Sequence, residues 1–192
     1  MSPSELEALR NENQLLRLKI SALEDQIESL KRQINTPTFL EELGLADERY
    51  FSRRLEEAVL SARRYARFVS IILVDISVEN RTMQAKNRTL ELAARFREEF
   101  RKTDLVAYQE AGKIFIMLEE ADPTQAIQAL RRVTREMVEV RQPNYALACF
   151  PSDSNRKEEL LDLLENRSQV VRKRLDEAPL VNTGEGVLSL SN

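Results

Sequence analysis

Apolar residues between Leu6 and Ile34 recur every seven positions, in two sets that lie three residues apart. This heptad pattern predicts a helix that pairs with a second helix in a coiled coil. Isoleucine in the first set and leucine in the second favour a parallel dimer, and the polar Asn13 in the first set fixes the register. A single amphipathic helix lying on the rest of the chain is the alternative. The expected interface positions are Leu6, Leu9, Asn13, Leu16, Ile20, Leu23, Ile27, Leu30 and Ile34.

After Pro37, which ends this helix, the pattern changes to amphipathic helices alternating with short apolar strands. Such a mixture predicts an α+β domain, with a central sheet covered by helices. We therefore expect a coiled-coil helix over 1–36, one domain over 37–180 and a tail over 181–192. Helices are expected at 47–68, 82–102, from 123 onward and at 156–177, and strands at 69–76, twice within 104–118, at 145–150 and at 187–190.

Composition narrows the chemistry that the 192 residues can perform. Histidine is absent, which excludes histidine-based acid–base catalysis and histidine metal ligands. Cys149 is the single cysteine and lies in an apolar strand, so we expect a buried, unreactive thiol. The net charge of −3 gives no reason to expect a nucleic-acid partner. No signal peptide and no apolar run of about 18 residues is present, so we expect a cytoplasmic protein without membrane contact.

Two apolar strands on either side of Gly112 predict a β-hairpin with Glu110, Ala111, Gly112 and Lys113 at its tip. Further short segments stand in a fixed order around it. LGLADERYF occupies 43–51, Asp75-Ile76-Ser77 ends the buried strand, and YALACFPSDSNRKEELLDLLE occupies 145–165. In this order the segments are similar to the GGDEF domain of bacterial diguanylate cyclases, and the resemblance covers nearly all of 40–178.

The resemblance implies a central sheet of the nucleotidyl cyclase type and a catalytic site that has been lost. Members of the family hold Mg²⁺ through acidic residues of the first strand and of the signature loop. Here Asp75 is kept, Ser77 is at best a weak neutral ligand, and the third signature position is Gly112. The two signature glycines are replaced, and the tip reads Glu110, Ala111, Gly112, Lys113 and Ile114.

The segment with which the family recognises guanine is also altered. Its FKxxND…GHxxGD pattern is replaced by VENRTMQAKNRTL at 78–90, which is shorter and contains no glycine. The resemblance therefore implies a protein that is not an enzyme and that needs no metal or other cofactor.

Many members of the family bind their product, cyclic di-GMP, at an inhibitory RxxD site upstream of the signature. Arg101 and Asp104 have this spacing, and Arg132 falls where the next helix commonly adds an arginine. A guanidinium can bond guanine O6 and N7 together, and a carboxylate can accept from its N–H edge. Arg101 can equally serve as a cation in the last turn of a helix, and Asp104 can bond local backbone.

Two functions are therefore expected. The first is a dimeric, non-catalytic cyclic di-GMP receptor that passes its state to an unidentified protein partner. The alternative is a nucleotide-independent dimeric scaffold or protein-interaction module. Binding of cyclic di-GMP distinguishes the two.

Overall fold

The structure is a computed structural model that describes residues 16–17, 19–20, 23–24, 39–40, 43–76, 83–109, 112–136, 143–172 and 180–190, without the side chains of 39–40, 83–86 and 136. The chain divides into two units, Met1–Pro37 and Thr38–Asn192. In the first unit, the described residues between 16 and 24 are helical. Leu6, Leu9, Asn13, Ile27, Leu30 and Ile34 of the expected coiled coil lie outside the described residues.

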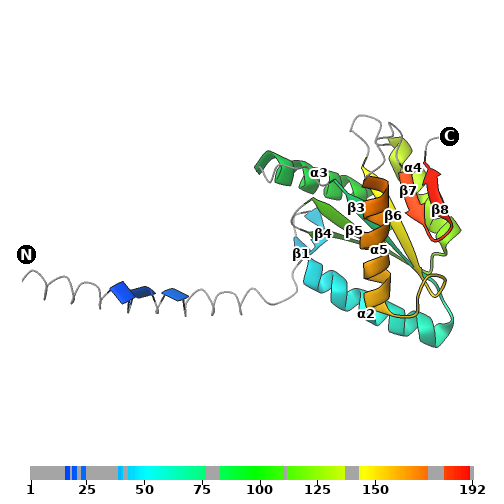
Figure 1. Ribbon diagram of the computed structural model, residues 1–192, viewed down its shortest axis with the longest axis horizontal. Coiled ribbons are helices and arrows are strands. Elements are labelled where there is room, and N and C mark those ends of the chain that lie inside the picture. Colours follow the sequence, from blue (N-terminus) through cyan, green and yellow to red (C-terminus); the bar gives the residue numbers. More distant parts are fainter. Residues whose placement is uncertain are drawn as a thin grey trace, which may run out of the picture. The chain divides into compact units, whose positions relative to one another are not determined.

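The second unit is built on a mixed sheet whose eight described strands run in the order β1-β2-β4-β5-β3-β6-β7-β8 (Figure 1). Neighbouring strands are antiparallel except for β2 with β4 and β6 with β7, which are parallel. The strands are β1 Phe39–Leu40, β2 Leu45–Ala46, β3 Val69–Asp75, β4 Leu105–Gln109, β5 Lys113–Glu119, β6 Asn144–Phe150, β7 Leu180–Thr183 and β8 Gly186–Ser189. The helices are α2 Glu48–Tyr65, α3 Met83–Glu99, α4 Pro123–Glu136 and α5 Lys157–Arg172.

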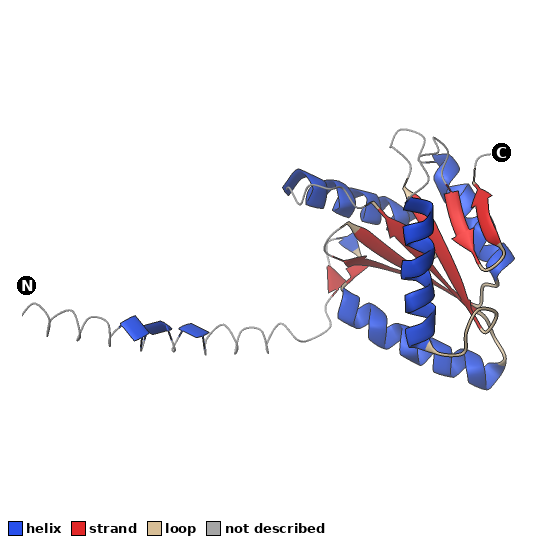
Figure 2. Ribbon diagram, in the orientation of Figure 1, coloured by secondary structure: helices blue, strands red, loops and turns tan. Residues whose placement is uncertain are grey.

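Helices cover both faces of the sheet, so the second unit has three layers (Figure 2). On one face, Phe51 and Leu55 of α2 and Leu160 and Leu164 of α5 pack into a single core cluster. On the other face, Phe96 of α3 and the apolar residues of α4 form a second cluster. The α+β class expected from the sequence is confirmed, with the helices on both sides of a mixed sheet.

Local signals explain where several elements begin and end. The carboxylate of Asp47 accepts a 2.7 Å hydrogen bond from the amide of Tyr50, which satisfies a free N–H group at the start of α2. Helix α2 ends where Ala66 adopts the left-handed conformation, at φ 51° and ψ 47°. Pro123 opens α4, where its missing N–H is harmless. The starts of α2 and α4 agree with the pattern-based predictions, whereas α2 ends three residues before the expected Phe68.

Strand β3 is buried along its length and lies between β5 and β6, as its continuous apolar sequence predicts. Its pairing has one consequence for the candidate site. Asp75, the last residue of β3, is level with Lys113 of β5 on one side and with Asn144 of β6 on the other. Three polar residues therefore stand side by side at one end of the three central strands.

The chain continues the sheet beyond residue 180, where the sequence suggested a tail with one short strand. Strand β7 pairs with β6, and β8 pairs with β7. The turn that joins them packs on a largely buried ion pair, in which the guanidinium of Arg167 donates to both carboxylate oxygens of Asp153 at 3.0 and 2.6 Å. A Cβ at Gly184 would lie 2.5 Å from the Asp153 carboxylate, so any larger residue would force Asp153 to shift and disturb the ion pair.

Two expectations from composition bear on the fold. Cys149 is fully buried, and burial raises the pKa of its thiol, as expected for an unreactive core residue. Within the described part of the chain, no helix is both long enough and apolar enough to cross a bilayer.

Candidate functional site

The first candidate site is the end of strands β3 and β5, where the sequence predicts a former catalytic centre. Asp75 ends β3 and Lys113 begins β5, whereas Ser77, Glu110 and Ala111 lie outside the described residues. Gly112 has φ 84°, and its carbonyl accepts a 2.9 Å hydrogen bond from the amide of Ile76. The side chain of Ile114 belongs to the buried core rather than to a site.

Helix α5 lies against this strand end and contributes three polar side chains to it. Glu165, Ser168 and Arg172 are spaced by three and four residues, which places them on one face of the helix. The ammonium of Lys113 lies 2.6 Å from each carboxylate oxygen of Glu165. The hydroxyl of Ser168 donates a 2.8 Å hydrogen bond to Oδ2 of Asp75, and a guanidinium nitrogen of Arg172 lies 3.8 Å from Oδ1.

We call Asp75, Lys113, Glu165, Ser168 and Arg172 the strand-end cluster. It contains two carboxylates and two cations, so its formal charge is balanced by side chains alone. The side chain of Asp75 is only 7% exposed, and both of its oxygens face groups of α5. Across the described residues, no group of three or more histidine, cysteine, aspartate or glutamate side chains is placed to hold a metal ion.

The sequence did not point to the members of this cluster on α5. One signal was available, because the buried stripe of α5 runs Leu160, Leu164, Ser168 and Val171. A serine in an otherwise apolar stripe is a buried polar group that needs a partner. Which partner it takes depends on Asp75, which is 93 residues away along the chain.

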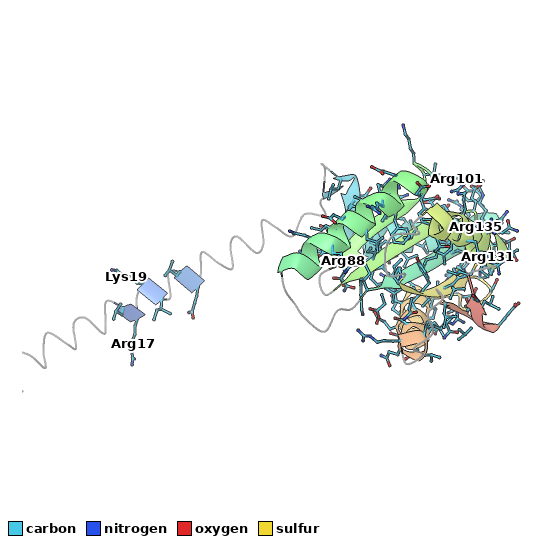
Figure 3. The ribbon with its side chains drawn as sticks, turned by 90° about the horizontal axis from the view of Figure 1, so that it is seen from above. Arg17, Lys19, Arg88, Arg101, Arg131 and Arg135 are labelled. Carbon is cyan, nitrogen blue, oxygen red and sulfur yellow. The ribbon has the colours of Figure 1, made fainter. Side chains whose placement is uncertain are left out.

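The second candidate site is the turn between α3 and β4, formed by residues 101–104. The amide of Arg101 donates a 3.0 Å hydrogen bond to Oδ2 of Asp104, and the amide of Asp104 donates a 3.0 Å bond to the carbonyl of Arg101. Asp104 is 9% exposed, whereas Arg101 is exposed (Figure 3). The local backbone role considered for Asp104 is therefore present in the structure.

Arg132 of α4 reaches the same region, as its spacing predicted. One of its guanidinium nitrogens donates a 3.0 Å hydrogen bond to the carbonyl of Glu99 at the end of α3. Burial raises the pKa of the Asp104 carboxyl. The hydrogen bond from the Arg101 amide and the charges of Arg101, Arg97 and Arg132 oppose that rise without cancelling it. Three residues chosen from sequence alone thus lie close enough for their charges to interact.

The turn offers groups that suit the edge of a guanine base. The guanidinium of Arg101 is exposed and forms no ion pair with a described residue. On the Asp104 carboxylate, Oδ2 bonds the Arg101 amide, while Oδ1 accepts no hydrogen bond from the described part of the chain. The guanidinium can donate to guanine O6 and N7, and the carboxylate oxygen can accept from the N–H groups of guanine. One turn therefore carries the groups that suit both hydrogen-bonding edges of the base.

The sequence matches no protein-family model and none of the curated proteins. Solved structures do match. The GGDEF domain of PA1120 from Pseudomonas aeruginosa aligns with a TM-score of 0.62 at 17% identity, over 72% of this chain and 97% of that one. The active GGEEF domain of a diguanylate cyclase from Vibrio cholerae aligns with a TM-score of 0.60 at 10% identity, over 70% and 96%. The fold is that of a GGDEF domain.

A third GGDEF structure aligns with more of the chain. It is the coiled coil and GGDEF domain of DgcB from Caulobacter crescentus in complex with cyclic di-GMP. The TM-score is 0.62 at 13% identity, and the alignment covers 93% of this chain and 99% of that one. The GGDEF fold expected from the short segments is therefore confirmed at low sequence identity.

Proposed function

We propose that this chain is a non-catalytic GGDEF-domain protein that binds cyclic di-GMP at Arg101 and Asp104, with Arg132 completing the site. The observation that carries the proposal is the convergence of these three residues on the turn between α3 and β4. Cyclic di-GMP contains two guanine bases, and the exposed guanidinium of Arg101 and the free oxygen of Asp104 match their edges. The complex of DgcB with cyclic di-GMP supports this choice of ligand.

The proposal that the chain is not an enzyme rests on the strand-end cluster and on the sequence of the hairpin tip. Mg²⁺ needs several oxygen ligands in a nearly octahedral arrangement. Gly112 supplies no side-chain ligand, and Asp75 is bonded to Ser168 and faces Arg172. A metal and a triphosphate would have to displace these contacts. The other carboxylate of the cluster, Glu165, is paired with Lys113, and no group of three or more histidine, cysteine, aspartate or glutamate side chains among the described residues is placed to hold a metal ion.

We also propose that two copies pair through residues 6–34. The heptad repeat supports a dimer, and the alignment with the coiled coil and GGDEF domain of DgcB extends over 93% of the chain. Leu16, Ile20 and Leu23 are helical, and in the single chain they are 50%, 54% and 56% exposed. A partner helix would bury these apolar side chains.

A calorimetric titration of the full chain with cyclic di-GMP tests the proposed ligand. One bidentate contact between arginine and guanine contributes roughly 1–3 kcal/mol, so Arg101→Ala is expected to weaken binding by about 10- to 100-fold. Arg132→Ala should weaken binding less, because one of its donors is already engaged with Glu99. Asp75→Ala lies at the other site and should change the affinity little.

Arg95→Ala is the matched control, since Arg95 is an exposed arginine of the same helix that precedes the turn. Absence of heat at about 100 μM ligand, a concentration far above a micromolar dissociation constant, would refute the receptor function. The nucleotide-independent scaffold is then the better account. It is favoured by the fact that Asp104 already bonds its own turn without a ligand. Equal binding by wild type and Arg101→Ala would refute the site assignment alone.

A further inference from the structure

The side chain of Arg97 spans the turn that carries the proposed ligand site. From α3, its Nη1 donates a 2.5 Å hydrogen bond to the carbonyl of Asp104, and its Nη2 donates a 2.7 Å hydrogen bond to the carbonyl of Arg101. These carbonyls belong to the first and last residues of the turn. One planar guanidinium therefore fixes both ends of the segment whose two side chains face the ligand.

The stem of Arg97 runs beside the turn between β1 and β2. Gly44, in the turn between β1 and β2, has φ 61°, and a Cβ built on it would lie 3.5 Å from Cγ and 3.8 Å from Cδ of Arg97. The side chain is half-buried at this point. It therefore follows a defined path from α3, past the Gly44 turn, to the two carbonyl groups.

We infer that Arg97 is a positioning residue for cyclic di-GMP, which it does not touch, and that it acts by fixing the turn of residues 101–104. The inference rests on the proposed function. Without the guanidinium, the bonds that remain within the described turn are the two between Arg101 and Asp104, each of which involves a backbone amide. A turn that is ordered before the ligand arrives loses less conformational freedom on binding, and this improves affinity.

A second explanation for any effect of Arg97 is its charge alone. A cation near Asp104 favours the ionised carboxylate and attracts the phosphates of the ligand. Arg97→Lys separates the two explanations, because lysine keeps the positive charge but lacks the planar pair of donors that bonds both carbonyls. Arg97→Met removes the charge and the donors together while keeping an unbranched stem.

Amide hydrogen exchange of the ligand-free chain, followed by NMR, tests whether Arg97 fixes the turn. The amides of Arg101 and Asp104 should exchange on the order of 10-fold faster in both Arg97→Lys and Arg97→Met, since each variant loses hydrogen bonds of a kind worth about 1.5 kcal/mol or more. Arg95→Met, two residues earlier on α3, should leave both rates unchanged. Unchanged rates in Arg97→Met would overturn the inference.

Titration of the same variants with cyclic di-GMP tests the consequence for binding. Both Arg97 variants should bind on the order of 10-fold more weakly, as preorganisation is lost, while Arg95→Met binds as the wild type does. Binding by Arg97→Lys equal to that of the wild type would show that charge suffices and would overturn the positioning role. If the wild type does not bind, the proposed function fails, and the exchange rates still show whether Arg97 fixes the turn.

Discussion

The hydroxyl of Ser168 on α5 donates a 2.8 Å hydrogen bond to Oδ2 of Asp75 at the end of β3. Ser168 is 2% exposed, so this contact lies beneath the helix rather than at its rim. Asp75, which the family resemblance places at a metal site, is thereby joined to helix α5, which covers one face of the sheet. The contact makes the Asp75 carboxylate part of the packing between helix and sheet.

Replacement of Ser168 should test how much this contact contributes to stability. Ser168→Ala removes one hydrogen bond to a largely buried carboxylate, and we expect a loss of about 1–3 kcal/mol in the free energy of unfolding. Urea unfolding measures the difference. Ser61→Ala, at an exposed position of α2, is the control and should change stability by less than about 0.5 kcal/mol. A Ser168→Ala variant as stable as this control would show that the hydrogen bond makes no net contribution to the free energy of unfolding.

Incubation of the protein with GTP and Mg²⁺ or Mn²⁺ should yield no cyclic di-GMP. Gly112 offers no side-chain metal ligand, and the cations of Lys113 and Arg172 already balance the two carboxylates of the strand-end cluster. Chromatography of the reaction mixture is the measurement, with the Asp75→Ala variant as the control for contaminating activity. Turnover by the wild type that disappears in Asp75→Ala would contradict the proposal that the chain is not an enzyme.

The buried pair of Asp153 and Arg167 should make stability depend on pH at the acidic end. Burial of the Asp153 carboxyl raises its pKa, but the hydrogen bonds from Arg167 and from the Cys149 amide, together with the Arg167 charge, lower it by more. The net pKa therefore lies below the usual 3.8. A lowered folded-state pKa contributes stability that is present above about pH 4 and is lost as the pH falls through the folded value.

We expect Asp153→Asn to lose about 3 kcal/mol at pH 7, because it leaves Arg167 buried without its counter-ion. The difference in the free energy of unfolding between variant and wild type should narrow below pH 4. Asp104→Asn is a control, because its stability relative to the wild type should change with pH in the opposite direction. Folding raises the pKa of Asp104, so the ionised carboxylate is disfavoured in the folded state. Urea unfolding from pH 7 to pH 2.5 measures both. A gap for Asp153→Asn that stays constant with pH would contradict this assignment.

Removal of residues 1–36 should leave a folded domain that is monomeric at micromolar concentration, whereas the full chain should be a dimer. Residues from Thr38 onward form a unit of their own with a complete core on both faces of the sheet. Light scattering gives both masses. In the full chain, Leu23→Asp should weaken the dimer, and Leu60→Asp, at a similarly exposed leucine of α2, should not. A full-length monomer would refute the coiled coil.

Much of the fold follows from the sequence because its main elements carry strong local signals. Strand β3 is a continuous apolar run, α2 begins at an aspartate cap, and Pro123 marks the start of α4. Strands β1 and β2 have two residues each and owe their existence to pairing, which no local pattern predicts. Strand β7 was missed for a similar reason, because its four residues are defined by their place beside β6.

The residues of the candidate sites also divide into those that a local sequence pattern predicts and those that only the folded structure brings together. The convergence of Arg101, Asp104 and Arg132 was predicted because a known spacing linked them. Arg97 was not, since one arginine among 29 basic residues looks like any other until its two carbonyl partners are seen. The partnership of Lys113 with Glu165 joins residues 52 positions apart and depends on how α5 crosses the sheet. Long-range contacts of this kind are properties of packing rather than of local sequence.

The strand order also bears on how two copies can coexist. Among the described strands, the sheet ends in β1, with two residues, and in β8, with four, so both of its outer strands are short. Long, flat edges are the places where sheets of separate molecules fuse and aggregate. Two domains tethered by a coiled coil meet at an effective concentration of roughly millimolar, where pairing between their sheet edges would be favoured. Short edges would let each domain of the proposed dimer keep its own sheet at that concentration.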